Sequence, residues 1–592
     1  MKYMIKETLL GSDGNIQGYK VVDENNIEIN LSNSELSRLI SVGAIELNMQ
    51  GEVSTGVKIE GWHGSFITGD QLHTKVERST KLNKRKQYAE IVAWVENQLV
   101  NKEPMILALH GLRRTGKTTL MHQVCNYFDT QIKCAYAEMN STISSRDLID
   151  KIHTLVKDGY KLIVIDEITE VNGFLSWVSH LADTIATLGI AVIISGTQSY
   201  EIKISEKKPL FDRVKLIDTT FISIKEFSRI FNTTSILDYI KFGGIMYTTR
   251  EKENDLNGML DYIDTAVSYN IDNTLKDATI ARIKLKDGYL TELDSNELKP
   301  LIATLLEATS LEKVESSISK KFDDKLLRAA SNILFKGIAS KDVINKVAIE
   351  DPWDGLHSII AIPDKYNKQE VLDTITELVE VLKEMSILTT IKCISRRAEK
   401  KDGTSELRIH NEICFNQPSL RYELVIGSMN RAKTRAMLEL MQSGVSKDQA
   451  ETEVKQLVNK IISIGEGNMI EEAIKVNMQN LYGDTYDMYQ YRFIVAEQSV
   501  KTGSIVQKDG EIDIVVEDRL TNKKVLFEIK RSDEIDVVNQ CYWLTHPYLE
   551  KILPNVTDRY VLYNGKDTEV VSRDKKVKYR NIHLFFSNSV KE

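Results

Sequence analysis

One run of residues has the composition and spacing of a phosphate-binding loop. Residues 111–119, Gly-Leu-Arg-Arg-Thr-Gly-Lys-Thr-Thr, match the pattern G-x-x-x-x-G-K-[ST] without a gap. Glycines let such a loop close around an anion, so that successive N–H groups point at phosphate oxygens. Lys117 would reach the β- and γ-phosphates, and the Thr118 hydroxyl would ligate Mg²⁺. The expected nucleotide contacts are Gly111, Arg114, Thr115, Gly116, Lys117, Thr118 and Thr119.

The elements around this loop are those that the chemistry requires. Residues 105–110 form a short apolar run that predicts a buried strand, and residues 119–125 predict a helix. The N-terminus of a helix adds partial positive charge beside a bound phosphate. A turn that merely contains glycine would not need this strand–helix context, so we expect ATP to bind here.

A second motif supplies carboxylates for the same site. Residues 161–167, Lys-Leu-Ile-Val-Ile-Asp-Glu, form an apolar strand that ends in two acids. Asp166 would hold Mg²⁺ and its hydration shell, because a hard cation prefers oxygen ligands. Glu167 would polarise the attacking water. Taken alone, a strand with a solvated acidic end would be the better interpretation, but the upstream loop favours ATP hydrolysis.

Two further positions are candidates for sensing the γ-phosphate. A third apolar strand, residues 190–194, is followed by Ser-Gly-Thr-Gln, so Thr197 or Gln198 could contact the phosphate or the water. A plain loop start is the alternative. Arg213 is the candidate for an arginine that senses or stabilises γ-phosphate charge. Most arginines are instead solvated or in structural ion pairs.

Length and composition bound the function. The 592 residues predict three to five domains, and 42% hydrophobic with 27% charged residues is typical of a soluble globular protein. A net charge of −8 excludes a global basic footprint for nucleic acid, so DNA contacts must come from local patches. Five scattered cysteines without C-x-x-C favour a reducing cytoplasm and argue against a structural zinc. No apolar run predicts a membrane span or a signal segment, so we expect a cytoplasmic protein.

The pattern of elements divides the chain. Strands alternate with helices from 105 to about 220, which predicts an α/β fold with a parallel sheet. The expected order is a small α+β module (1–60) with a hairpin and a helix at 32–40, a P-loop ATPase core (75–235), a helical lid (236–300), a winged-helix region (301–425) and an α/β domain (430–592). The basic run 80–86 is interpreted as a solvated linker.

Two strands near residue 400 flank a basic turn. Residues 388–394 and 406–410 predict a hairpin after a helix at 368–385, which we interpret as the wing of the winged helix. The basic residues at 396–401 could grip a DNA backbone. An inert spacer is the alternative interpretation.

A second chemical constellation lies near the C-terminus. Residues 511–518 and 524–530 predict a hairpin in which Asp513 lies opposite Glu528, with Lys530 on the same side. The apolar side would carry Ile512, Ile514, Phe527 and Ile529. Two adjacent carboxylates could share Mg²⁺, and Lys530 could orient the attacking water. A preceding helix offers Glu471 or Glu472 as a further metal ligand. An amphipathic surface hairpin with solvated charges is the alternative.

With both constellations in view, residues 80–592 resemble the prokaryotic archaeal-type P-loop ATPases of the AAA/STAND-like group. The resemblance rests on Gly-Leu-Arg-Arg-Thr-Gly-Lys-Thr at 111–118, Ile-Asp-Glu at 165–167, Ser-Gly-Thr at 195–197, Arg213, Phe-Gly-Gly at 242–244, Met-Ile-Glu at 469–471, Glu-Ile-Asp at 511–513 and Glu-Ile-Lys at 528–530. Ile-Met-Tyr follows Phe-Gly-Gly where a proline is usual. The resemblance implies a winged helix and a C-terminal PD-(D/E)xK nuclease-like domain with metal ligands Asp513 and Glu528.

Two functional hypotheses follow. The first is an ATP-binding and hydrolysing protein whose nucleotide state controls a Mg²⁺-dependent DNA nuclease, in defence or mobile-element biology. The second is an ATP-switched DNA- or partner-binding regulator with an inactive nuclease-like fold. Both imply ATP and Mg²⁺ as cofactors and DNA contacts through the C-terminal domain and the basic segment 396–401, with no membrane partner. Neither fixes whether the chain forms a homo-oligomer.

Overall fold

The computed structural model describes residues 3–10, 16–23, 28–32, 66–207, 209–246, 368–396, 407–422, 441–498 (except 443 and 445) and 504–588, with single positions between 268 and 302. The chain divides into two compact units, Met1–Trp62 and His63–Glu592. None of the described helices has the length and apolar character that a membrane crossing needs.

The N-terminal unit contains a three-stranded antiparallel sheet. Its strands are β1 (Tyr3–Leu10), β2 (Ile16–Asp23) and β3 (Glu28–Ser32), in that order. The predicted hairpin is the β2–β3 pair, in which Tyr19 lies opposite Leu31. Strand β1 was not predicted. Beyond Ser32, the helix predicted at 32–40 lies outside the described residues.

A five-stranded parallel sheet forms the centre of the predicted ATPase core. Its order is β5-β6-β7-β4-β8, and every neighbouring pair is parallel. The strands are β4 (Ile106–His110), β5 (Cys134–Glu138), β6 (Leu162–Asp166), β7 (Ala191–Ser195) and β8 (Val214–Asp218). The helices are α2 (Gly69–Thr80), α3 (Gln87–Asn101), α4 (Lys117–Phe128), α5 (Ser145–Lys157), α6 (Phe174–Leu188) and α7 (Ser199–Lys207).

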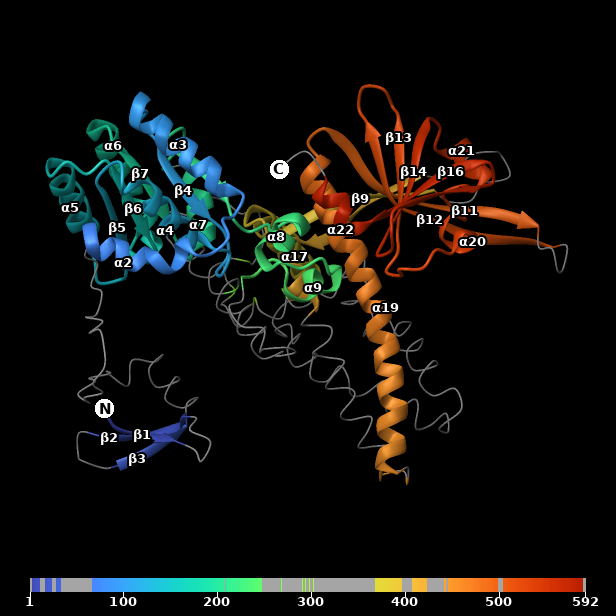
Figure 1. The fold of residues 1–592 in the computed structure, drawn as a ribbon, viewed down its shortest axis with the longest axis horizontal. Coiled ribbons are helices and arrows are strands. Elements are labelled where there is room, and N and C mark those ends of the chain that lie inside the picture. Colours follow the sequence, from blue (N-terminus) through green and yellow to red (C-terminus); the bar gives the residue numbers. More distant parts are fainter. Residues whose placement is uncertain are drawn as a thin grey trace. The chain divides into compact units, whose positions relative to one another are not determined.

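The sequence of these strands explains their position. Each residue of β4, β6 and β7 is buried, because helices cover the sheet and leave no face for polar residues. Helices α5 and α6 supply one side of this core, and Figure 1 shows the strands between them and α3. Since all five strands run in one direction, the carboxyl ends of β4, β6 and β7 meet at one edge, and the phosphate-binding loop begins there.

The C-terminal part is built on an eight-stranded mixed sheet of order β10-β9-β11-β12-β13-β14-β16-β15. The strands are β9 (Leu388–Arg396), β10 (Leu407–Phe415), β11 (Tyr486–Gln498), β12 (Ile505–Asp518), β13 (Lys524–Ile529), β14 (Val556–Tyr563), β15 (Thr568–Ser572) and β16 (Lys575–Asn581). The helices are α17 (Lys368–Glu384), α19 (Lys447–Tyr482), α20 (Val537–Gln540), α21 (Pro547–Ile552) and α22 (Ile582–Ser587). Figure 1 shows α19 as the long orange helix.

The hairpin interpreted as a wing belongs to this sheet. Strands β9 and β10 pair as predicted, with His410 opposite Cys393. However, β9 also pairs in parallel with β11, so the hairpin forms the edge of the C-terminal sheet. The boundary predicted between 425 and 430 therefore does not separate it from the last domain. Residues 397–401 of the basic turn, most of the lid at 236–300 and most of the winged-helix region at 301–425 lie outside the described residues.

The predicted register of the β12–β13 hairpin is confirmed, but one face assignment is wrong. Ile514 pairs with Phe527, which puts Asp513 opposite Glu528. Ile514, Phe527 and Ile529 share one core cluster, whereas Ile512 packs in another with Val515. The cause is a β-bulge, since Val515 lies opposite Tyr489 while Ile512 lies opposite Tyr491. The extra residue on β12 interrupts the regular alternation of side chains between the two faces, so Ile512 and Ile514 point to opposite faces.

Two short helices follow β8 and pack on the C-terminal part. Helices α8 (Ile224–Phe231) and α9 (Ile236–Phe242) place Phe227 and Tyr239 in one core cluster with Ile474 of α19 and Phe527 of β13. The backbone N–H of Ile224 donates to Oδ1 of Asn477 at 2.8 Å, and Nδ2 of Asn477 donates to the Tyr239 hydroxyl at 3.1 Å. The end of the predicted ATPase core is therefore hydrogen-bonded to α19.

Candidate nucleotide and metal sites

The loop between β4 and α4 has the backbone of a phosphate cradle. Gly111, Arg114 and Gly116 have φ of 145°, 60° and 88°. A Cβ on Gly111 would lie 2.2 Å from Oγ1 of Thr219, so this position requires glycine for space as well as conformation. The Thr115 hydroxyl donates to the Leu112 carbonyl at 2.8 Å and lies 2.8 Å from the Thr219 hydroxyl. Helix α4 begins at Lys117, directly after this loop.

Lys117 is folded onto its own loop. Its Nζ donates to the carbonyls of Gly111 at 2.7 Å and Leu112 at 2.9 Å, and its side chain is buried. Burial lowers the pKa of Lys117, and the nearby Glu167 and Asp166 carboxylates act against that shift. A buried ammonium satisfied only by carbonyls is a ready partner for an anion, because phosphate oxygens would supply the missing negative charge.

Asp166 ends β6 at the centre of a hydrogen-bond network. It accepts from the Thr118 hydroxyl at 2.6 Å, the Tyr136 hydroxyl at 3.1 Å and the backbone N–H of Glu167 at 3.0 Å, and from the Ser195 hydroxyl. The structure thus brings together the two predicted Mg²⁺ ligands, Thr118 and Asp166. Their oxygen donors fit Mg²⁺. Sequence reasoning missed Tyr136 and Ser195, although both lie at or near the same strand ends.

Glu167 is held in place for a different task. Its backbone is left-handed, with φ of 55°, and its Oε2 accepts the backbone N–H of Thr197 at 2.7 Å. Burial and the adjacent Asp166 raise the pKa of Glu167. A partly buried carboxylate with a raised pKa at the carboxyl end of β6 is suited to accept a proton from water. Thr197 contributes its N–H, while its hydroxyl donates to Glu170 at 3.3 Å, and the N–H of Gln198 donates to the Thr169 hydroxyl at 3.3 Å.

Arg213 lies at the amino ends of the parallel strands, away from the carboxyl ends that carry the phosphate-binding loop. It precedes β8, and its carbonyl accepts the N–H of Ile106 at the amino end of β4. The phosphate-binding loop follows the other end of β4, so Arg213 does not reach the nucleotide site of its own chain. Its guanidinium pairs with Asp183 at 2.5 Å and is 44% exposed. Any contact with a γ-phosphate must therefore be made to another copy of the chain.

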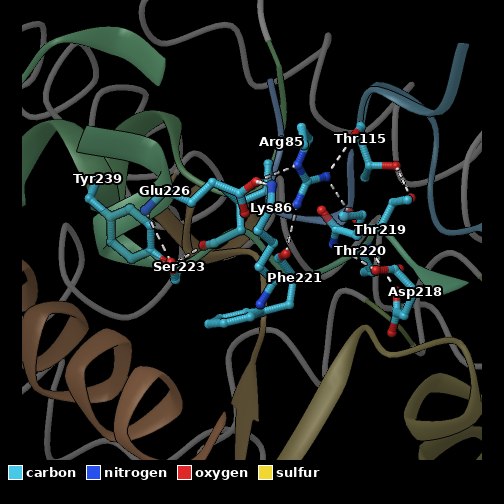
Figure 2. A network of polar contacts seen from close by, with 12 residues as sticks. Arg85, Lys86, Thr115, Asp218, Thr219, Thr220, Phe221, Ser223, Glu226 and Tyr239 are labelled. Atoms are coloured by element: carbon cyan, nitrogen blue, oxygen red, sulfur yellow. Dashed lines mark hydrogen bonds and ion pairs between the residues drawn. The ribbon is translucent and has the colours of Figure 1, made fainter. Parts of the chain in front are cut away.

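Arg85 is a buried residue of this region that the sequence did not reveal. Figure 2 shows its guanidinium between the phosphate-binding loop and α8. It donates to both Glu226 oxygens at 3.0 and 3.1 Å and to the carbonyls of Thr115 at 2.5 Å, Thr219 at 2.7 Å and Phe221 at 2.9 Å. All five N–H donors of the guanidinium are thereby used. The interpretation of 80–86 as a solvated linker is wrong at Arg85, whose side chain is only 3% exposed.

Glu226 completes this ion pair from α8. Its side chain is fully buried, and it also accepts the backbone N–H of Lys86 at 2.8 Å. Burial acts to raise the pKa of Glu226, but Arg85 and the hydrogen bonds outweigh it and hold the pKa below its ordinary value. The pair fixes the loop carbonyl at Thr115 to the first turn of α8.

The second site lies where β12 and β13 meet α19. Asp513 is buried, and its Oδ2 accepts the backbone N–H of Ile529 at 2.7 Å. Lys530 Nζ lies 2.5 Å from Oε1 of Glu528, while Oε2 of Glu528 is buried without a hydrogen-bond partner among the described residues. Burial raises the pKa of Glu528 to about 7, and burial with the neighbouring Glu528 and Glu471 raises the pKa of Asp513.

Of the two acids predicted from the preceding helix, Glu471 faces this site. Carboxylate oxygens of Glu471, Glu511 and Asp513 all lie within 4.8 Å of one another. Glu472 instead pairs with Arg421 and accepts the backbone N–H of Phe415 at 2.9 Å. Sequence reasoning missed Glu511, which stands two residues before Asp513. Asp513 and Glu528 are buried, whereas Glu471 and Glu511 are partly exposed. Two buried carboxylates beside two partly exposed ones, with one buried oxygen of Glu528 lacking a hydrogen-bond partner among the described residues, fit a divalent cation with oxygen ligands.

The parallel sheet, the phosphate-binding loop and the acidic strand end define a P-loop ATPase. Residues 103–228 match the family described as an AAA domain, so the chain carries an AAA-type ATPase domain. No curated protein matches the chain in sequence.

Three solved structures are among those to which this chain is similar. PCH-2 of C. elegans is 14% identical, with 48% of this chain and 75% of that chain covered and a TM-score of 0.22. Drosophila ORC bound to DNA is 12% identical, covering 66% of this chain and 100% of that one, with a TM-score of 0.22. DnaA from Aquifex aeolicus bound to AMPPCP is 13% identical, covering 50% and 88%, with a TM-score of 0.19.

Proposed function

We propose that the nucleotide state of the ATPase domain controls a Mg²⁺-dependent DNA nuclease centred on Asp513. The observation that carries this proposal is the cluster of Glu471, Glu511 and Asp513, with Glu528 on the adjoining strand and Lys530 beside it. Carboxylates packed this closely repel unless a cation lies among them. Burial, together with that repulsion, raises the pKa values of Asp513 and Glu528.

The chemistry follows from these residue types. Glu471, Glu511, Asp513 and Glu528 would hold Mg²⁺, which when bound supplies Lewis-acid polarisation of a phosphodiester. Lys530 carries its ammonium at the edge of the cluster, with its side chain 34% exposed, where it would orient the attacking water. Lys475 pairs with Glu471 at 2.6 Å and keeps that carboxylate on the cluster side of α19.

A chain of buried contacts supports control by the nucleotide. Arg85 joins the Thr115 carbonyl of the phosphate-binding loop to Glu226 of α8. The same helix begins at Ile224, whose N–H donates to Asn477. Asn477 and Glu471 are both on α19. A change in the loop on ATP binding therefore has a path of hydrogen bonds to the helix that supplies an acid to the cluster.

The test uses the purified full chain with plasmid and single-stranded DNA, with and without ATP, and with Mg²⁺ or Mn²⁺. We expect cleavage that requires the divalent cation and changes with ATP. Asp513→Asn should abolish cleavage and retain ATP hydrolysis. Glu517→Gln is the matched control, because Glu517 is on the same strand but pairs with Lys524 at 2.9 Å outside the cluster. Cleavage by Asp513→Asn at the wild-type rate would refute the nuclease site.

A second variant separates control from chemistry. Asn477→Ala removes the hydrogen bonds to Ile224 and Tyr239 and leaves both sets of catalytic groups in place. We expect ATP hydrolysis and ATP-free cleavage to persist, while the response of cleavage to ATP falls. An unchanged ATP response would show that control takes another path.

The alternative is an ATP-switched regulator that binds DNA or a partner without cutting. The observation that favours it is the pairing of the cluster with lysines, since Lys475 and Lys530 already offset two of the acids. The overall charge of −8 also gives DNA no general attraction. DNA binding that responds to ATP, with no cleavage by the wild-type chain in Mg²⁺ or Mn²⁺, would support this function in place of the first.

A further inference from the structure

We propose that Cys393, His410 and Glu412 form a site for a zinc-class transition-metal ion at the edge of the C-terminal sheet. Cys393 and His410 are direct partners across the β9–β10 pair, and Glu412 lies two residues further along β10 on the same face. The thiol sulfur, an imidazole nitrogen and a carboxylate oxygen all lie within 4.8 Å of one another.

The donor set selects the class of metal. A thiolate and an imidazole are ligands for Zn²⁺ and its neighbours, whereas Mg²⁺ takes oxygen ligands. Around a tetrahedral Zn²⁺, with bonds of about 2.0–2.3 Å, neighbouring ligand atoms are about 3.5 Å apart. The three side chains therefore need only small rotations to close on an ion. The absence of C-x-x-C in the sequence argues against a structural zinc, but it does not exclude ligands brought together across two strands.

An unpaired atom points to a missing partner. Nδ1 of His410 is buried and has no hydrogen-bond partner among the described residues. Buried polar atoms are nearly always satisfied, and an orphaned one calls for an explanation such as an ion. Cys393, directly across from it, is fully buried, so the thiol sulfur and this imidazole nitrogen are both shielded from water.

Charges around the third ligand hold it in position. Glu412 accepts from Arg492 at 2.9 Å and faces Lys475 at 3.6 Å. Lys475 is closer to Glu471, at 2.6 Å, so Glu412 is the weaker of its two partners. A carboxylate oxygen that accepts one hydrogen bond keeps a lone pair for a metal, and hydrogen-bonded carboxylates are usual around protein metal ions. Arg492 also contacts Glu511 at 3.2 Å. The site therefore adjoins the acid cluster, that is, the carboxylates of Glu471, Glu511, Asp513 and Glu528.

The charge balance is favourable. Binding releases the Cys393 proton to solvent, so a dication meets one thiolate and one carboxylate, and the ion with its two anionic ligands carries no net charge. Three protein ligands leave a fourth position for water, as in zinc sites that are not purely structural. The ion would tie β9 to β10 next to the acid cluster on α19, β12 and β13.

Cobalt substitution tests the proposal directly. The full chain, freed of metal with a chelator, is titrated with Co²⁺ and followed by absorption. We expect an intense thiolate-to-cobalt charge-transfer band that saturates with one Co²⁺ bound at this site, and displacement of that band by Zn²⁺. Cys393→Ala should remove the band, and His410→Asn should weaken Co²⁺ binding at least about tenfold.

The matched control is Cys414→Ala. Cys414 is a buried thiol two residues beyond Glu412 on the same strand, outside the cluster, and its variant should keep the band. Asp513→Asn should also keep it, which separates this site from the acid cluster. Zn²⁺ should raise the melting temperature of wild type and of Cys414→Ala by more than it raises that of His410→Asn. A wild-type chain without a thiolate band, or a band that survives Cys393→Ala, would overturn the proposal.

Discussion

The buried pair of Arg85 and Glu226 gives the sharpest quantitative expectation. Glu226→Gln keeps the shape of the side chain but removes its charge, and the side chains of the pair are 3% and 0% exposed. The amide oxygen can still accept from Nε of Arg85 and from the N–H of Lys86. The amide nitrogen then faces a guanidinium N–H where Oε2 accepted at 3.1 Å, so two donors oppose each other. Arg85 remains charged and buried without a counter-charge.

The expected loss of stability in Glu226→Gln follows from leaving Arg85 buried without a counter-charge. Breaking one side of a buried ion pair costs about 3–5 kcal/mol. In a domain of this size each kcal/mol lowers the melting temperature by about 2–4 °C, so we expect a drop of about 6–20 °C. The matched control is Glu90→Gln. Glu90 pairs with Lys215 at 2.8 Å, but the two side chains are 51% and 37% exposed, so its loss should cost at most about 1 kcal/mol.

The assay must isolate the ATPase domain, because a chain with several domains does not unfold in one step. The transition that moves upward with added ATP and Mg²⁺ belongs to this domain, and its midpoint is compared between variants. Arg85→Met should be more damaging still, since it strips hydrogen bonds from the carbonyls of Thr115, Thr219 and Phe221. If Glu226→Gln and Glu90→Gln have the same melting temperature, the ion pair of Arg85 and Glu226 does not hold the phosphate-binding loop to α8, and this prediction is refuted.

The remaining predictions concern the two sites. Lys117→Ala should abolish ATP binding by calorimetry, and an unaltered affinity would contradict the assignment of the loop. Glu167→Gln should bind ATP but hydrolyse it about a hundredfold more slowly, because a general base is lost; equal turnover would place the base elsewhere. Because burial raises the pKa of Glu528 to about 7, its folded form favours the proton below that pH and binds cations above it. Mg²⁺ should therefore raise the melting temperature more at pH 8 than at pH 6, and Glu528→Gln should reduce that difference. The lowered pKa of Glu226 acts in the opposite sense, so its stabilisation is complete at neutral pH and is lost as the pH falls from 4.5 through the lowered value; Glu226→Gln should flatten the acid side of the stability profile.

The parts of the sites that could be predicted from the sequence are of two kinds. They are either short continuous motifs or residues placed opposite each other by the alternation of side chains in a hairpin. The phosphate-binding loop and the pair Asp166–Glu167 are local motifs whose strand context is visible in the chain. The opposition of Asp513 and Glu528 followed from alternation across a short hairpin and is confirmed by the pairing of Ile514 with Phe527. The expected alternation of side chains was wrong at Ile512, because β12 carries a bulge there. The bulge arises from how β12 pairs with β11, and the sequence of β12 alone does not show it.

Other contributors come from distant parts of the chain. Arg85 meets Glu226 across 141 positions, and nothing near Arg85 distinguishes it from the lysines around it. Tyr136 reaches Asp166 only because β5 and β6 are neighbours in the sheet. Cys393 and His410 become partners through a hairpin whose register no local pattern specified. These contacts depend on tertiary packing, which a single sequence does not encode in any local spacing.

The parallel pairing of β9 with β11 affects how this protein folds during synthesis and which fragments of it are expected to be soluble. Five residue pairs, from Tyr489 with Lys392 to Phe493 with Arg396, join segments almost a hundred positions apart. During synthesis the β9–β10 hairpin leaves the ribosome long before β11 exists, so its outer edge must wait for a late partner. A fragment starting at residue 430 would lack both strands and expose the edge of β11 to pairing with other chains. Soluble fragments of the C-terminal part should therefore begin before Leu388.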